Sequence, residues 1–197
     1  MTDQSTHSKN CIYIFIGPEG AGKTTQANML SEALHLPIIS TGDMLRHFAK
    51  DDTGVLGTAA RKMFAEHSYL DAEAMLKMMR EQLQDSLYQE GAILDGSLRT
   101  YEETRRFNEV FEQLDVEPSV IVLFLTISHE ESIQRLVYGR RRADDIIQSV
   151  EARLSHFHER LEDRLALIAK KYQLIEINGM PEKEKVHEEI MEKINGK

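Results

Sequence analysis

The chain has 197 residues, of which 41% are hydrophobic and 29% charged, and its formal net charge is −9 at pH 7. The length fits one well-buried domain, and the composition is that of a soluble globular protein. The longest apolar run, residues 120–127, is too short to span a membrane. The negative charge argues against nucleic acid as a general partner, so we expect small-molecule partners and neither nucleic acid nor a membrane.

The first ten residues, MTDQSTHSKN, contain neither a basic segment nor an apolar segment of the kind found in targeting signals. We therefore expect residues 1–10 to be a disordered lead-in, residues 11–197 to form a single domain, and the protein to be cytoplasmic. Cys11 is the only cysteine and opens an apolar run, so it is expected to be buried and unreactive, without an internal disulfide.

Residues 17–25, GPEGAGKTT, match the phosphate-loop pattern G-x-x-x-x-G-K-[ST] through two glycines, Lys23 and Thr24. They follow an apolar run at residues 12–16 and precede a helix-like run that ends at about Leu34, which is the context this loop requires. The glycines let backbone N–H groups surround a phosphate, the helix adds free N–H groups and the positive end of its dipole, and the lysine adds a charge. The pattern predicts a nucleoside triphosphate site.

Strand and helix signals continue to alternate after the loop. Residues 37–40 form a short predicted strand, and apolar spacings of three and four predict three helices between residues 43 and 89. Helices inserted between two strands of a parallel sheet form a protruding lobe, where a second ligand can be held apart from the first. Residues 91–96 then show a buried-strand pattern with Asp95 near its carboxyl end, where doubly wound sheets bind ligands, so Asp95 is a candidate for the Mg²⁺ side of the site.

The second half of the chain contains a run of three arginines within GRRRADD, residues 139–145. Asp145 with Gln148 three residues later resembles a capping box, which predicts one helix from Asp145 to about Tyr172. The other predicted elements of this half are helices at residues 101–114 and 129–138, strands at 119–126 and 173–177, and a C-terminal helix from residue 181.

Four segments resemble, in order and spacing, the adenylate kinase branch of the nucleoside monophosphate kinases. They are GPEGAGKTTQA at the phosphate loop, STGDMLR at residues 40–46, LDGSLRT at residues 94–100, and RRADD with Arg153 behind it. The resemblance implies a P-loop three-layer α/β/α fold with a five-stranded parallel sheet, a helical lobe for the monophosphate at about residues 40–70 and a short lid at about residues 139–145. The lid has no cysteines, which excludes the zinc site of some relatives.

The resemblance also implies a monomeric enzyme that transfers the γ-phosphoryl group of MgATP to AMP and gives two ADP. The implied catalytic residues are Lys23, Arg99, Arg135, Arg142 and Arg153. ATP is assigned to Gly17, Gly20, Ala21, Gly22, Lys23, Thr24, Thr25, Arg135, Arg140 and Gly179. AMP is assigned to Thr41, Arg46, Leu70, Gly96, Arg99, Glu103, Arg142 and Arg153, and Mg²⁺ to Thr24, Thr25 and, through water, Asp95.

Physical chemistry explains both the many arginines and the lack of an obvious base. Two anionic substrates must be brought together while charge moves from one to the other, and guanidinium groups neutralise them without acting as nucleophiles. The acceptor is a phosphate that is already largely ionised, so no general base is needed. Arg141 is the arginine of this run that we expect to be merely solvated.

Four residues depart from the family pattern. Thr24 stands where a glycine is usual, which restores the general phosphate-loop pattern, and Ser97-Leu98 replaces Phe-Pro ahead of Arg99. Glu103 stands where adenylate kinases usually have a glutamine that reads the adenine of AMP. A carboxylate cannot donate to the adenine ring nitrogen but can accept two hydrogen bonds from guanine. We therefore expect Glu103→Gln to raise kcat/KM for AMP.

Several alternatives stay open. GMP, UMP or CMP could be the acceptor, although Thr41 and Thr100 are adenylate-type residues and argue against a pyrimidine. A P-loop kinase of a non-nucleotide hydroxyl should carry a carboxylate base, and a silent relative need not keep the arginines. A GTPase switch also has a phosphate loop and an α/β sheet, and residues 51–54 match D-x-x-G. That match lies between helical segments and not at a strand end, and the chain has no N-K-x-D motif.

Overall fold

The structure is a computed structural model that describes residues 10–66, 68–112, 114, 117–141 and 145–196. Five strands form one parallel sheet in the order β2-β3-β1-β4-β5, which confirms the predicted fold class. The strands are β1 (Cys11–Ile16), β2 (Ile38–Ser40), β3 (Gly91–Asp95), β4 (Ser119–Thr126) and β5 (Gln173–Asn178), close to the predicted positions. The expected lead-in at residues 1–10 lies, apart from Asn10, outside the described residues.

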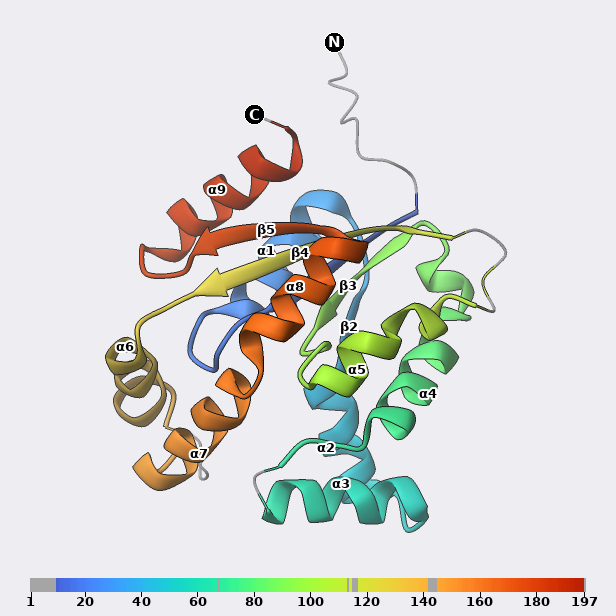
Figure 1. Cartoon of the computed structure of the whole chain (residues 1–197), viewed down its shortest axis with the longest axis vertical. Coiled ribbons are helices and arrows are strands. Elements are labelled where there is room, and N and C mark those ends of the chain that lie inside the picture. The colour runs from blue at the N-terminus through green and yellow to red at the C-terminus, as the bar shows by residue number, and fades with distance from the viewer. Residues whose placement is uncertain (1–9, 67, 113, 115–116, 142–144, 197) are drawn as a thin grey trace.

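Helices cover both faces of the sheet (Figure 1). They are α1 (Lys23–Leu34), α2 (Thr41–Asp51), α3 (Val55–Ala65), α4 (Ala72–Leu83), α5 (Tyr101–Arg106), α6 (His129–Ile133), α7 (Ile147–His158), α8 (Leu161–Lys171) and α9 (Lys183–Ile194). Short 3₁₀ turns follow α4 and α5 at Ser86–Tyr88 and Phe107–Val110. The three helices predicted between residues 43 and 89 are confirmed as α2, α3 and α4.

The central strand β1 shows why two helical layers form. All six of its side chains are buried, and they alternate between two apolar clusters. Ile12 and Ile14 belong to a cluster with α4 and the segment after α5, whereas Tyr13 and Phe15 belong to a cluster with α1 and α9. Because a strand of period two that is apolar on both faces must be covered on both, β1 becomes the middle of a three-layer sandwich.

Two predicted helices differ from the observed ones. The helix predicted from Asp145 to Tyr172 is two helices, because Arg160 adopts a left-handed backbone (φ 52°) and its guanidinium lies 3.4 Å from the ring centre of Tyr101 on α5. The helix predicted to end before Gly139 continues as a π-helix over Gln134–Arg140. Asp145 is not a cap: Ile146 precedes α7 without a side-chain hydrogen bond, since the Asp145 carboxylate binds arginines instead.

Cys11 is buried as predicted, and burial raises the pKa of its thiol, which opposes reactivity. Within the part of the chain that the structure describes, no helix combines the length and the apolar character needed to cross a bilayer.

Candidate active site

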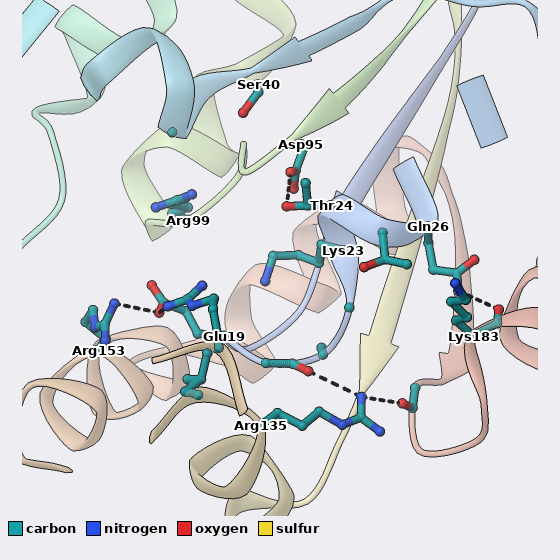
Figure 2. Close-up of a pocket in the computed structure, with 18 of the residues that line it drawn as sticks. Glu19, Lys23, Thr24, Gln26, Ser40, Asp95, Arg99, Arg135, Arg153 and Lys183 are labelled. Atoms are coloured by element: carbon teal, nitrogen blue, oxygen red, sulfur yellow. Dashed lines mark hydrogen bonds and ion pairs between the residues drawn. The ribbon is translucent and has the colours of Figure 1, made fainter. Parts of the chain in front are cut away.

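A cleft of about 840 Å³ opens at the carboxyl ends of β1 and β3. Its wall is drawn from the phosphate loop, the start of α2, the end of α3, the segment after β3, the π-helix, α7 and the β5–α9 turn (Figure 2). The predicted site residues in the wall are Gly20, Ala21, Gly22, Lys23, Thr24, Thr25, Arg46, Asp95, Arg99, Arg135, Arg140, Arg153 and Gly179. Residues far apart in the sequence therefore meet where a doubly wound sheet binds ligands.

The phosphate loop has a backbone that other residues adopt only with strain. Gly17 has φ +148°, and a Cβ atom there would lie 2.5 Å from the Leu125 carbonyl oxygen, so the loop can pass over β4 only with glycine. Gly22 precedes α1 at φ 91°, and because it has no side chain it leaves the N-terminus of the helix uncapped. The first N–H groups of α1 have no partner within the helix and are available to an anion.

Lys23 lies folded onto its own loop. Its Nζ donates to the carbonyl oxygens of Gly17 at 2.7 Å and Pro18 at 2.8 Å. Burial lowers the pKa of Lys23 to about 8, while the negative charges of Asp95 and Glu19 act in the opposite direction. The ammonium is thus held at the mouth of the loop, where a phosphate would replace the carbonyl contacts with charge-assisted ones.

Thr24 and Asp95 form the oxygen-rich side of the cleft. The Thr24 hydroxyl donates to the Asp95 carboxylate at 2.6 Å, and Thr25 is an exposed part of the same wall. Hydroxyl and carboxylate oxygens suit Mg²⁺, which in proteins keeps several waters and takes the rest of its ligands from substrate phosphates. Within the described residues no group of three or more His, Cys, Asp or Glu side chains could form an all-protein metal cage. The donor set therefore fits a magnesium ion that arrives with a nucleotide.

The predicted acceptor side is built on the turn after β3. Thr41 is fully buried, and its hydroxyl lies 3.0 Å from the Gly96 carbonyl oxygen. Arg99 Nε donates to the same oxygen at 2.6 Å, and its guanidinium lies over the Tyr69 ring at 5.7 Å. Arg46 reaches the cleft from α2 and pairs with Asp43 at 2.5 Å. Two arginines from different elements thus border the place where a second phosphate can sit.

Leu70 and Glu103 are not in the wall of the cleft. Leu70 packs in the apolar core. The buried Glu103 carboxylate accepts hydrogen bonds from the backbone N–H groups of Leu98 at 2.6 Å and Arg99 at 3.0 Å. This placement corrects the prediction that Glu103 reads the acceptor base, because both its oxygens are used to hold the strained turn in which Leu98 has φ 58°.

Glu103→Gln is now expected to destabilise the protein instead of improving its use of AMP. An amide has one acceptor oxygen where the carboxylate has two, so one buried N–H group loses its partner, at a cost of about 1–3 kcal/mol. Urea denaturation measures this change in the free energy of unfolding. Glu102→Gln is the control, since Glu102 is a half-exposed neighbour paired with Arg105, and its replacement should leave stability unchanged. A stable Glu103→Gln variant with higher kcat/KM for AMP would restore the original interpretation.

Arg135 joins the two ends of the donor side. Its Nη1 donates to the carbonyl oxygens of Gly20 at 3.3 Å and Gly179 at 3.0 Å, and Figure 2 shows it between these loops. A Cβ atom on Gly179 would lie 2.8 Å from the Thr126 oxygen and 3.0 Å from the Ala21 oxygen, so only glycine lets this turn approach the phosphate loop. The phosphate loop and the β5–α9 turn therefore form one continuous wall.

Arg140 and Arg153 meet at a buried acid. Asp145, whose side chain has no exposed surface, binds Arg140 at 2.6 and 2.8 Å and Arg153 at 3.0 Å. Arg142 lies outside the described residues, so its predicted role has no structural counterpart here. Arg141 is exposed as expected and donates to the Tyr138 carbonyl oxygen.

Sequence reasoning missed four residues of the site region. Glu19 lies in the phosphate loop and pairs with Arg153, Gln26 donates to the Lys183 carbonyl oxygen, and Tyr69 lines the cleft. The guanidinium of Arg164 is buried and donates to the Phe157 carbonyl oxygen, but its Nε and Nη2 have no acceptor among the described residues. A cavity of about 30 Å³ beside Arg164 is large enough for a water molecule. For Glu19, the sequence contains one signal of a special role, namely an acid within a glycine-rich loop.

Comparison with known proteins adds an independent finding. A family model described as adenylate kinase matches residues 15–173. An adenylate kinase of Pseudarthrobacter chlorophenolicus is 34% identical over an alignment of 189 residues that covers 92% of this chain and 95% of that protein. An adenylate kinase of Renibacterium salmoninarum is 34% identical over 191 residues (93% and 95%), and one of Leptospira biflexa is 31% identical over 185 residues (92% and 98%).

Proposed function

The chain belongs to the adenylate kinase family, and we propose that it transfers the γ-phosphoryl group of ATP to AMP and gives two ADP. The observation that supports this most is the pairing of two neighbouring strands. β1 leads into the phosphate loop and β3 leads into the turn that carries Arg99, and Phe15 and Asp95 are register partners near the ends of these strands. Two phosphate-binding elements are thereby held side by side at one cleft.

The mechanism follows from charge. Phosphoryl transfer requires little covalent chemistry from the protein, so catalysis depends on positioning and on stabilising the charge of the transferring group. Lys23 is placed to neutralise the donor phosphates, Arg46 and Arg99 to hold the acceptor phosphate, and Arg140 and Arg153 to surround the group in transfer, with Arg142 assigned by resemblance. The acceptor phosphate needs no base, because its second pKa is about 6.

We also propose that a magnesium ion binds at the oxygen-rich side of the cleft. Thr24 and Thr25 are assigned to Mg²⁺ directly and Asp95 through water, in keeping with the hydrogen bond from the Thr24 hydroxyl to the Asp95 carboxylate. The ion would supply positive charge at the donor phosphates. Asp95 meanwhile orients the threonine hydroxyl, and Lys23 carries the charge that the chain itself provides.

We also propose a place for each substrate. Residues of about 40–70 would form the acceptor lobe, and residues of about 139–145 would form the lid. The Gly179 turn and Gln26 would hold the donor base. Because Glu103 is turned away from the cleft, its carboxylate gives no reason to prefer GMP. We also propose that the enzyme is a cytoplasmic monomer.

Turnover with ATP and each monophosphate tests the function. We expect AMP to be the preferred acceptor over GMP, UMP and CMP, with formation of two ADP per cycle and no activity on simple alcohols. A preference for GMP would keep the broader monophosphate kinase assignment and reject AMP. Transfer only to a hydroxyl acceptor would reject both.

Nucleotide binding is expected to weaken as the pH rises above about 8. In the empty protein burial lowers the pKa of Lys23 from 10.5 to about 8, so the charged lysine costs stability at lower pH and that cost disappears as the pH rises from about 8 toward 10.5. Bound phosphates favour the ammonium, so ATP should bind with proton uptake near pH 8. Calorimetry in buffers of different ionisation enthalpy measures this uptake, and Lys23→Met should remove it. Unchanged proton uptake in Lys23→Met would assign it to another group.

A further inference from the structure

Glu19 is an acidic side chain inside a loop built to bind anions. Its Oε2 lies 2.8 Å from Arg153 Nη1 and 3.7 Å from Arg140 Nη2, and Figure 2 shows the contact with Arg153. Its charge also acts on Lys23. A carboxylate at this place repels an approaching phosphate, so its position requires a physical explanation.

Two acids hold the same pair of arginines, but in different ways. The Asp145 side chain is completely buried against Arg140 and Arg153. Glu19 is 30% exposed, lies in the wall of the cleft and contacts the arginines from the side of the phosphate loop. Asp145 is therefore a permanent partner, whereas Glu19 occupies a position that a ligand can take.

A carboxylate and a phosphate present similar oxygens to a guanidinium group. Both accept charge-assisted hydrogen bonds from arginine, and the phosphate carries more charge. Arg140 and Arg153 line the same cleft as Lys23, so phosphates bound to the loop come within reach of both arginines. Like charges repel, and the weaker anion, Glu19, has to move aside.

We propose that Glu19 is a positioning residue that takes the place of a phosphate in the empty enzyme. It holds Arg140 and Arg153 above the phosphate loop and is displaced when the donor phosphates bind. The inference rests on the proposed function only in requiring that phosphates occupy the loop. Glu19 then keeps the arginines assembled without nucleotide and lowers the affinity for nucleotide, because each binding event has to break its contacts.

Calorimetric titration of Glu19→Gln with ATP and with inorganic tripolyphosphate tests this displacement. Glutamine keeps the shape and removes the charge, so we expect both ligands to bind about tenfold more tightly than to the parent protein. Glu151→Gln is the matched control, because it makes the same charge change on α7, where Glu151 is half-exposed and pairs with His129. Its affinity should equal that of the parent. Equal or weaker binding by Glu19→Gln overturns the proposal.

Thermal denaturation separates displacement from an ordinary structural contact. Without ligand, Glu19→Gln should have a lower Tm than the parent, since the arginines lose a partner. With saturating tripolyphosphate the difference should vanish, because Glu19 is displaced in the parent as well. A difference that persists at saturation overturns the proposal.

The double variant keeps the test independent of folding defects and of the proposed function. In an Arg153→Gln background the effect of Glu19→Gln on tripolyphosphate affinity should be much smaller than in the parent background, as expected for coupled residues. An equally large effect in both backgrounds overturns the proposal. Tripolyphosphate has no base and needs no turnover, so a parent enzyme that fails to phosphorylate AMP rejects the proposed function while these measurements still decide the role of Glu19.

Discussion

Lys23→Ala is expected to lower kcat by about a thousandfold or more, because it removes a positive charge that we place at the transferring group. Its ammonium is seated on the phosphate loop by two carbonyl contacts. Stability should be retained, since burial lowers the pKa of Lys23 and its charge therefore destabilises the empty protein. A spectrophotometric assay of ADP formation measures the loss, and circular dichroism checks the fold.

Lys77→Ala is the control for removing a lysine, because Lys77 is exposed on α4 and pairs only loosely with Glu81. Its turnover should equal that of the parent. Activity of Lys23→Ala within a few fold of the parent would contradict the assignment of the phosphate loop.

Arg99→Met is expected to lower kcat/KM for AMP by about a hundredfold or more while the affinity for ATP stays within a few fold. Arg99, which we assign to the acceptor phosphate, is held by its bond to the Gly96 carbonyl oxygen and by the ring of Tyr69. Loss of a charge-assisted contact with the acceptor phosphate should therefore affect one substrate. Kinetics at varied AMP and calorimetry with ATP alone separate the two effects.

Gly96→Ala is a second substitution that should displace the Arg99 guanidinium, in this case without removing its charge. A Cβ atom at Gly96 would lie 2.5 Å from Arg99 Nη2 and 2.6 Å from Thr41 Oγ1, and the residue has φ +96°. The variant should therefore show the same pattern as Arg99→Met. Normal AMP kinetics in both variants would place the acceptor phosphate elsewhere.

The sheet could be predicted from the sequence because its signals are local. β1, β3 and β4 are short apolar runs that end at turn residues, a pattern typical of buried parallel strands. The phosphate loop was predictable for a similar reason, since its glycines and Lys23 act through backbone geometry within a few residues. These elements matched the structure closely.

The misses involve side-chain contacts that compete with the helix and capping patterns. Asp145 matches a helix cap by its local pattern, but its carboxylate is better satisfied by Arg140 and by Arg153 from the next helix. The break at Arg160 has no glycine or proline, and the guanidinium of this residue lies over an aromatic ring on α5. Glu103 stands where relatives have a glutamine, but its carboxylate binds two backbone N–H groups at once. Local patterns do not contain these competing contacts.

The place of α2, α3 and α4 in the chain bears on how parts of the molecule can open independently. These helices form one insertion between β2 and β3, and α2 packs chiefly on its sequence neighbour α3. β1, in contrast, is bonded along its length to β3 and β4, which come from much later in the chain. Contacts that are local in sequence can break and re-form without separating the sheet. Amide protons of α2 and α3 can therefore exchange with solvent through small openings. Amide protons of β1 exchange only when the whole domain unfolds. The proposed acceptor lobe is thereby expected to have a lower free energy of opening than the sheet to which it is attached.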